Sequence, residues 1–261
     1  MEQENKNLPE VEIPEVKVVS EAEVPPIGVI KKELIDTWIP RTKLGIKVQN
    51  REITDINQIL SSGIKILEPQ IVDVLLSNLE SDFALIGQSK GKFGGGKRSI
   101  WRQTQRKTKE GNKPKFSTLV IVGDKNGHVG IGLGKAKETV PAREKAQRAA
   151  KTNIINIRRG CGSWACSCST PHSIPFKVYG RCGSVKVELL PAPKGTGLAT
   201  EKETRKLLAL AGIKDIHSKT YGQTRTKINL MYAYFEALKN LTKTKVKPTY
   251  YKQSGLVEGS V

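Results

Sequence analysis

A glycine-rich hairpin is the sequence feature that most constrains the fold. Branched apolar residues at 119–122 predict a strand. The sequence Asp-Lys-Asn-Gly follows at 124–127 and is a hairpin signal, in which Asn126 and Gly127 are expected to supply positive φ angles. The chain returns as a predicted strand over 128–134 with glycine at alternate positions, which lets another backbone approach one face of the strand. The pattern predicts an antiparallel pair with a second element packed closely on it.

The segments around this hairpin read as helices. A helix over 138–153 carries a face of small residues that suits close packing on a sheet, namely Ala142, Ala146, Ala149 and Ala150. Upstream, Pro69 suits the first turn of a helix over 69–79, and a short strand is expected at 83–86. The order helix, strand, hairpin, helix predicts an α+β unit over 69–153.

A second apolar pattern follows and predicts another α+β unit over 154–241. The pattern begins with an apolar run at 154–157, and strands are expected at 174–179, 184–190 and 213–217. Thr200 and Glu203 have the spacing of a capping box, which would open a helix that stops at Gly212. A last helix is expected over 226–241. The sequence thus predicts two small domains of mixed helix and sheet.

The two ends of the chain have different compositions. Residues 1–25 hold seven glutamates against two lysines, with several prolines, which predicts an acidic disordered tail over 1–30. An N-terminal extension over 31–68 is expected to wrap onto the next domain, with Trp38 as an apolar anchor and a short helix ending at Gly63. Residues 242–261 are predicted to be a C-terminal tail.

Targeting signals are not expected in this chain. No run of about 18 apolar residues predicts a membrane span, and the N-terminus lacks the pattern of a signal peptide. We therefore predict a cytoplasmic protein whose four cysteines are reduced or metal-bound.

Positive charge is the main functional signal. The chain has 44 Lys and Arg against 25 Asp and Glu, a net charge of +19, which favours a polyanionic partner. Residues 88–115 alone hold ten cations and one acid, Glu110, around a glycine triplet. We predict a loop that stays mobile until a polyanion orders it, with an ordinary solvated loop as the alternative. Its candidate RNA ligands are Lys90, Lys92, Lys97, Arg98, Arg102, Arg106 and Lys107.

Further candidate RNA contacts lie outside this loop. They are Lys135, Arg143, Arg158, Arg159 and Lys194. The last three occupy small basic turns, for which a phosphate contact and an exposed loop are equally good readings.

The glycines before Lys135 do not form a nucleotide-binding loop. That motif needs four residues between its first glycine and Gly-Lys, followed by Ser or Thr. Val129 stands at the first glycine position and Ala136 follows the lysine. A glycine-rich strand under a helix is the better interpretation.

Four cysteines raise the possibility of a structural zinc site. The ligand set would be Cys161, Cys166, Cys168 and Cys182, with His172 as a substitute for one of them. Reduced thiols packed near RNA are the alternative. No paired carboxylates, nucleophile elbow or Ser-His-Asp pattern stands out, so we predict that the protein is not an enzyme.

Several motifs together resemble small-subunit ribosomal protein five, over about 38–241. The stretch Val-Gly-Asp-Lys-Asn-Gly-His-Val-Gly-Ile-Gly-Leu-Gly-Lys-Ala at 122–136 is similar to that family. So are Pro-Ala-Pro-Lys-Gly-Thr-Gly at 191–197 and Leu-Ala-Gly-Ile at 210–213. The stretches at 38–45 and 158–164 resemble the archaeal and eukaryotic branch, and the cysteines look archaeal.

The resemblance implies a fold and a function. The fold would be an N-terminal domain like the double-stranded-RNA-binding fold, followed by a C-terminal domain with a left-handed β-α-β crossover. The function would be binding of ribosomal RNA during assembly of the small subunit, beside neighbouring proteins of that subunit. The resemblance also implies a place where messenger RNA enters, an influence on translational accuracy, and no homo-oligomer.

Two other functions remain open at this stage. An RNA-modifying enzyme could use the cysteine site, in which case Cys166→Ser should abolish turnover. A free-standing binder of duplex RNA would not sediment with the small subunit in high salt.

Overall fold

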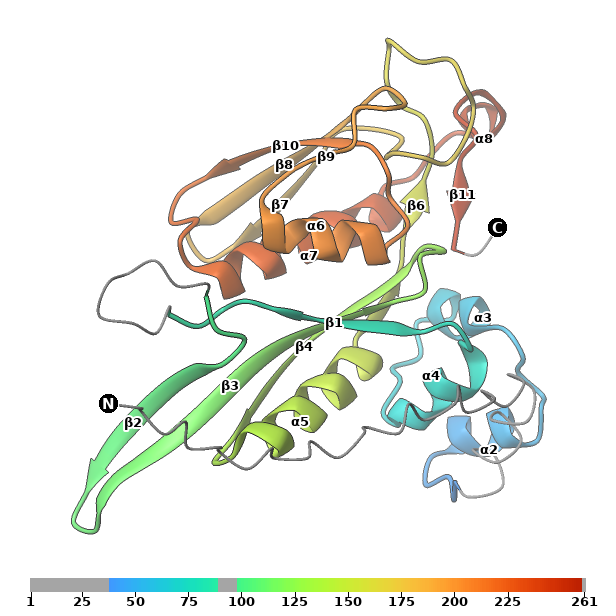
Figure 1. The fold of residues 1–261 in the computed structure, drawn as a ribbon. Helices are drawn as coiled ribbons and strands as arrows, with labels where there is room; N and C mark the ends of the chain where they lie inside the picture. Colours follow the sequence, from blue (N-terminus) through green and yellow to red (C-terminus); the bar gives the residue numbers. More distant parts are fainter. Residues whose placement is uncertain (1–37, 89–97, 260–261) are drawn as a thin grey trace, which may run out of the picture.

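The computed structural model describes residues 38–88 and 98–259 (Figure 1). The predicted acidic tail over 1–30 lies outside these residues, as do Lys90, Lys92 and Lys97. Within the described part of the chain, no helix combines the length and apolarity needed to cross a bilayer.

The first sheet is built on one long strand. β3 (Gly111–Gly123) pairs antiparallel with β4 (His128–Ala136), which pairs in turn with β5 (Ile154–Asn156). On its other side β3 pairs first with β2 (Arg102–Thr108) and then with β1 (Glu80–Ala84). The predicted hairpin and the predicted strand before it are confirmed.

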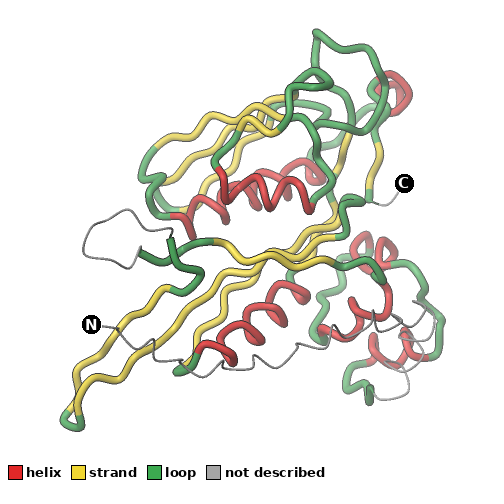
Figure 2. The backbone as a smooth tube through the Cα atoms, viewed as in Figure 1, coloured by secondary structure: helices red, strands yellow, loops and turns green. Residues whose placement is uncertain are grey.

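Part of the predicted loop is a β-ribbon, and that prediction was wrong for 102–115. β2 and the outer half of β3 form a seven-residue antiparallel register, from Arg102 opposite Ser117 to Thr108 opposite Gly111. Figure 2 shows the two strands projecting away from the rest of the protein. The ribbon could not be predicted from its residues, because both of its faces are polar and no apolar side chain recurs at every second position.

Helix α5 (Thr139–Thr152) packs on β4 through the glycines, as predicted. A Cβ placed on Gly132 would lie 2.2 Å from the backbone oxygen of Ala146, and one on Gly134 would lie 2.2 Å from the oxygen of Ala142. Only glycine allows the strand and the helix to approach this closely.

The turn between β3 and β4 differs from the prediction in one residue. Lys125 (φ 60°) and Gly127 (φ 100°) adopt the positive φ angles, not Asn126. Asp124 Oδ1 accepts hydrogen bonds from the backbone N–H groups of Asn126 and His128, at 2.7 and 3.0 Å. The aspartate therefore sets the conformation of the turn.

The second sheet has the order β7 (Val178–Cys182), β8 (Val185–Pro191), β10 (Ile216–Tyr221) and β9 (Leu198–Ala199). β9 and β10 run parallel and are connected by α6 (Lys202–Leu210), which forms a β-α-β crossover. The long last helix is α7 (Lys227–Lys243). Both helices were predicted.

The predicted capping box is absent. The N-cap of α6 is Glu201, whose side chain makes no capping hydrogen bond. Instead, Glu203 Oε2 accepts from the backbone N–H of Leu85, at 2.9 Å. Glu203 therefore makes a contact with the first half of the chain and does not cap its own helix. The spacing of residues along the chain could not reveal this contact.

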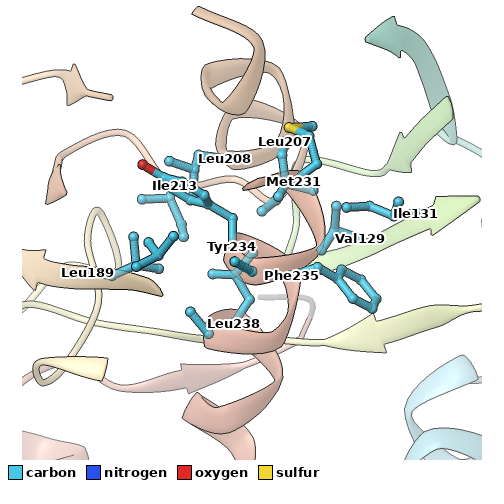
Figure 3. Packing of buried hydrophobic residues seen from close by; sticks show 14 of the residues in the cluster. Val129, Ile131, Leu189, Leu207, Leu208, Ile213, Met231, Tyr234, Phe235 and Leu238 are labelled. Atoms are coloured by element: carbon cyan, nitrogen blue, oxygen red, sulfur yellow. The ribbon is translucent and has the colours of Figure 1, made fainter. Parts of the chain in front are cut away.

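Helices α6 and α7 lie between the two sheets, as Figure 1 shows. Their apolar faces form one continuous core with the inner faces of both sheets, including Ile131, Leu189, Leu207 and Tyr234 (Figure 3). The two α+β units therefore share a core. α5 covers the opposite face of the first sheet.

The N-terminal extension forms two short helices, α2 (Lys43–Gln49) and α3 (Ile56–Ser61). They share an apolar cluster with α4 (Pro69–Leu75), so the extension packs onto the next unit, as predicted. Trp38 is buried, as expected of an anchor, and its Nε1 donates to Glu68 Oε2 at 3.1 Å.

Residues beyond 242 contribute to the fold as well. They form α8 (Pro248–Gln253) and β11 (Val257–Glu258), which pairs with β6 (Arg158–Arg159). The segment predicted as a tail is thus partly built into the protein.

Candidate nucleic-acid interface and a cysteine–histidine cluster

The β2–β3 ribbon sorts its cations onto one face. Side chains alternate between faces along a strand, and residues opposite each other on paired strands share a face. By register, five cations fall on the face that continues into Leu119 and Ile121: Arg102, Arg106, Lys113, Lys115 and Lys135. The other face of the ribbon carries one strand cation, Lys107, among Gln103, Gln105 and Asn112.

This arrangement is electrostatically unfavourable for the protein alone. Arg106 stands directly opposite Lys113, and like charges in that position destabilise a strand pair. One acid relieves it, because Glu110 Oε2 lies 2.6 Å from Lys113 Nζ, but both side chains are exposed. A surface of this kind is well suited to a bound polyanion.

A shallow groove continues the positive surface at the outer end of β4. Its lining includes Lys115, Lys135, Lys137 and Lys145, together with one acid, Glu138. These four lysines are exposed. The groove joins the ribbon to the first turns of α5.

Arg143 is held by stacking. Its guanidinium lies 4.2 Å from the ring centroid of Trp101 and 5.4 Å from that of Phe83, within the range of cation–π contacts. Stacking fixes the plane of the guanidinium group, while the Arg143 side chain stays exposed. Its N–H groups can therefore donate to an acceptor outside the protein. Sequence reasoning identified Arg143 but missed Trp101, because only the fold brings 101 beside α5.

The basic pair on β6 has a structural role, which corrects its assignment as an RNA contact. Arg159 is 5% exposed and donates to the backbone oxygens of Asn126 (2.9 Å) and Gly259 (3.0 Å). Burial lowers the pKa of Arg159, and the nearby Asp124 opposes that effect. Arg158 pairs with Glu258 and donates to the backbone oxygen of Leu241. These guanidinium groups are held by other parts of the protein, Arg159 by the β3–β4 turn and Gly259, and Arg158 by Glu258 and the end of α7.

The other two candidates in the described residues are accessible. Arg98 is exposed just before the ribbon, and Lys194 is exposed in the loop over 193–197. Neither belongs to the strands of the ribbon, and Lys194 lies in the second α+β unit.

The structure brings three cysteines and a histidine together. The Sγ atoms of Cys161, Cys166 and Cys168 and a ring nitrogen of His172 all lie within 4.8 Å of one another. Cys182 is on β7, packed against the main core, and is not a member of this cluster. The fourth residue is therefore the substitute, His172, and the ligand set that included Cys182 is corrected.

The thiols of the cluster differ in acidity. Burial, together with a hydrogen bond to Cys168, raises the pKa of Cys161 to about 11. Hydrogen bonds from Thr170 lower the pKa of Cys168 to about 6. Three thiols and an imidazole are the ligand set that zinc takes in structural sites.

The same cluster contains a Cys-His-Asp sequence of contacts. Cys166 Sγ lies 3.9 Å from His172 Nε2, and His172 Nδ1 lies 2.8 Å from Asp215 Oδ2. Such contacts also occur in nucleophilic catalysis. Two further thiols beside Cys166 favour a metal site instead, since a nucleophile needs only one.

Family models define the class of protein. The model for ribosomal protein S5, N-terminal domain, matches residues 100–158, and the model for its C-terminal domain matches residues 180–247. These matches cover the ribbon sheet and the β-α-β sheet. The class is that of ribosomal proteins, which are structural and not enzymes, as the sequence predicted.

Individual relatives narrow the class to one family. The small ribosomal subunit protein uS5 of Nanoarchaeum equitans is 50% identical over 227 residues, 87% of this chain and 97% of the relative. That of Methanocaldococcus jannaschii is 47% identical over 227 residues, 87% of this chain and 98% of the relative. The chain belongs to the uS5 family of small ribosomal subunit proteins, which confirms the resemblance found in the sequence.

Proposed function

We propose that this protein binds small-subunit ribosomal RNA as a structural scaffold, with the β2–β3 ribbon as its main contact. The observation that carries the proposal is the cationic face of Arg102, Arg106, Lys113, Lys115 and Lys135. No ion pair in the described structure neutralises four of these five, and Lys113 pairs only with an exposed acid.

Binding would depend on phosphate position more than on base identity. Arginine offers two parallel N–H donors to phosphate oxygens, and each neutralised phosphate releases counterions. Alternate residues of one strand lie roughly 7 Å apart, which is close to the phosphate spacing of a nucleic-acid strand. The ribbon can therefore follow an RNA backbone over several nucleotides.

Secondary contacts would come from the groove and its surroundings. Lys137 and Lys145 extend the cationic surface onto α5, and Arg143 presents a stacked guanidinium beside it. Arg98 and Lys194 would touch RNA from other directions. We keep Lys90, Lys92, Lys97 and Lys107 as predicted RNA contacts, of which Lys107 lies on the other face of the ribbon.

The place of the protein in the ribosome is part of the proposal. As a uS5 family member it would support assembly of the small subunit beside neighbouring proteins, near the region where messenger RNA enters, and would influence translational accuracy. The protein would be located in the cytoplasm, as part of the ribosome. It would not form a homo-oligomer. A structural zinc ion in the Cys–His cluster would be its one cofactor.

The test is a charge comparison on the full chain. Arg102→Gln, Arg106→Gln and Lys115→Gln together remove three charges from the ribbon face. The matched control removes three exposed charges from the N-terminal extension, as Lys43→Gln, Lys47→Gln and Lys65→Gln. Binding to a folded small-subunit RNA transcript is measured at several salt concentrations, with circular dichroism as a check on folding.

The ribbon variant should reduce the slope of log affinity against log salt by roughly 2–3, since each phosphate contact contributes about 0.7–0.9. The control should keep most of the original slope. Equal slopes in the two variants would mean that net charge alone attracts RNA, and would refute the ribbon as the interface.

A further inference from the structure

The Cys–His cluster is connected to a glycine loop through a single buried carboxylate. We infer that Asp215 and the loop over 193–197 form the outer layer of a zinc site whose ligands are Cys161, Cys166, Cys168 and His172. Zinc binding then holds this loop, and Lys194 within it, in place. The inference rests on the zinc ion of the proposed function and assigns Asp215 a positioning role.

The spacing of the four ligand atoms suits a tetrahedral ion. Zinc bonds of about 2.3 Å to sulfur and 2.0 Å to nitrogen hold the ligands of a tetrahedron roughly 3.5 Å apart. The Cys166 Sγ to His172 Nε2 distance is 3.9 Å, and all four atoms lie within 4.8 Å of one another. A small contraction of the cluster would bring them to zinc.

The orientation of His172 favours metal binding. The residue is 5% exposed, and its Nδ1 lies 2.8 Å from Asp215 Oδ2. Because a carboxylate accepts hydrogen bonds, Nδ1 is the donor to Asp215, and Nε2 is the ring nitrogen that faces the thiol of Cys166 and would bind zinc. A carboxylate that orients a histidine in this way is a common outer partner of zinc.

Asp215 carries this contact on to the glycine loop. It is 4% exposed, and its second oxygen, Oδ1, accepts from the backbone N–H groups of Gly195 (3.1 Å) and Gly197 (2.8 Å). The backbone oxygen of His172 in turn accepts from Lys214 and Asp215. The carboxylate thus joins a ligand of the cluster to the segment that leads into β9.

The cysteine segment has little regular secondary structure. Between 160 and 173 its secondary structure is limited to one isolated bridge, Gly160 to Ser173. Trp164 within it is fully exposed. A segment without an apolar core of its own is the usual setting for a structural metal, because metal binding replaces the missing packing energy.

The experiment compares four proteins: the unmodified full chain, Cys166→Ser, Asp215→Asn, and Cys182→Ser as a matched cysteine control outside the cluster. Zinc content is measured after purification, and zinc affinity by competition with a chelator. Cobalt is then substituted for zinc, since its absorption reports tetrahedral thiolate ligation. Amide hydrogen exchange at Gly195 and Gly197 is followed with zinc and after chelation.

We expect one zinc per chain in the unmodified protein and in Cys182→Ser. Cys166→Ser should lose zinc. Asp215→Asn should keep the tetrahedral cobalt spectrum but bind zinc about 10- to 100-fold more weakly. Chelation should accelerate exchange at both glycines in the unmodified protein.

The two parts of the proposal fail separately. A folded, unmodified chain without zinc would overturn the zinc ion itself. Normal zinc affinity in Asp215→Asn, or glycine exchange that ignores chelation, would overturn the role of Asp215 while leaving the zinc ion. If Asp215→Asn does not fold, His172→Cys replaces it. That variant keeps four zinc ligands but removes the ring that binds Asp215, so zinc should stay and glycine exchange should rise; slow exchange would count against the link.

Discussion

The two halves of strand β3 differ both in strand pairing and in burial: the inner half pairs with β1 and β4, and the outer half pairs with β2. From 117 to 123 every residue is buried between helices, whereas from 111 to 115 every residue is exposed. The inner half gains stability from apolar burial, and the outer half has only its pairing with β2. A two-stranded ribbon is marginal by itself in water, so the inner half anchors the outer one.

This difference shows how the fold is divided between stability and binding. The outer half carries opposed like charges that a protein stabilised for its own sake would avoid. The inner half carries the buried apolar residues of the core and pairs with the glycines of β4 that allow α5 to pack closely. Changes in the inner half should therefore affect folding, and changes in the outer half should affect RNA binding.

The largest expected effect is at Gly132 of β4, which stands opposite Val120 in the buried half of β3. Gly132→Val would place its Cβ 2.2 Å from backbone atoms of α5, where no side-chain rotation can relieve the clash. We expect a loss of at least about 3 kcal/mol in the free energy of unfolding, measured by chemical denaturation. Thr104→Val, in the exposed ribbon, is the control and should change stability by less than about 0.5 kcal/mol. Similar losses in both variants would contradict the division of β3.

A smaller effect is expected from replacing two arginines, one buried (Arg159) and one in the exposed ribbon (Arg106). Arg159→Met leaves buried backbone oxygens near the β3–β4 turn without their donor, so we expect about 2–4 kcal/mol of destabilisation. Arg106→Met should leave thermal stability unchanged and weaken RNA binding instead. Both quantities are measured on both variants, by thermal denaturation and by RNA titration. If Arg159→Met weakened RNA binding without affecting stability, its structural assignment would be wrong.

The smallest effect concerns acid and the turn at the inner end of β3. Burial alone would raise the pKa of Asp124, but His128 and the backbone N–H groups of Asn126 and His128 outweigh it, so the pKa lies below the ordinary 3.8. The carboxylate therefore stabilises the turn above about pH 4, and this stabilisation is lost as pH falls through the folded-state value.

Amide exchange at Asn126 and His128, corrected for intrinsic rates, should accelerate relative to the core as pH falls from 5 to 3. In Asp124→Asn the same amides should show a much smaller dependence on pH. Unchanged protection in the unmodified protein across this range would show that the aspartate does not hold the turn.

Much of the fold was predictable because buried helices and strands place apolar or small residues at regular spacing in the sequence. The apolar run of β3, the alternating glycines of β4 and the alanines of α5 identified the first sheet and its helix. The exposed ribbon was missed because strands without an apolar face show no such periodicity, although its cations predicted a segment that binds a polyanion. The motifs of the two sheets were specific enough to show the family.

The sequence by itself determined the charge, the hairpin, the order of helices and strands, and the relationship to uS5. Tertiary structure decided which of several residues of the same type are buried, exposed or close to a candidate site. Arg159 is buried, whereas Arg106 is exposed. His172 lies in the cysteine cluster and Cys182 does not, and Trp101 stacks on Arg143. The physical reason is that these outcomes depend on contacts between residues far apart in the chain, such as Arg159 with Gly259 and His172 with Asp215. Local spacing contains no information about such contacts.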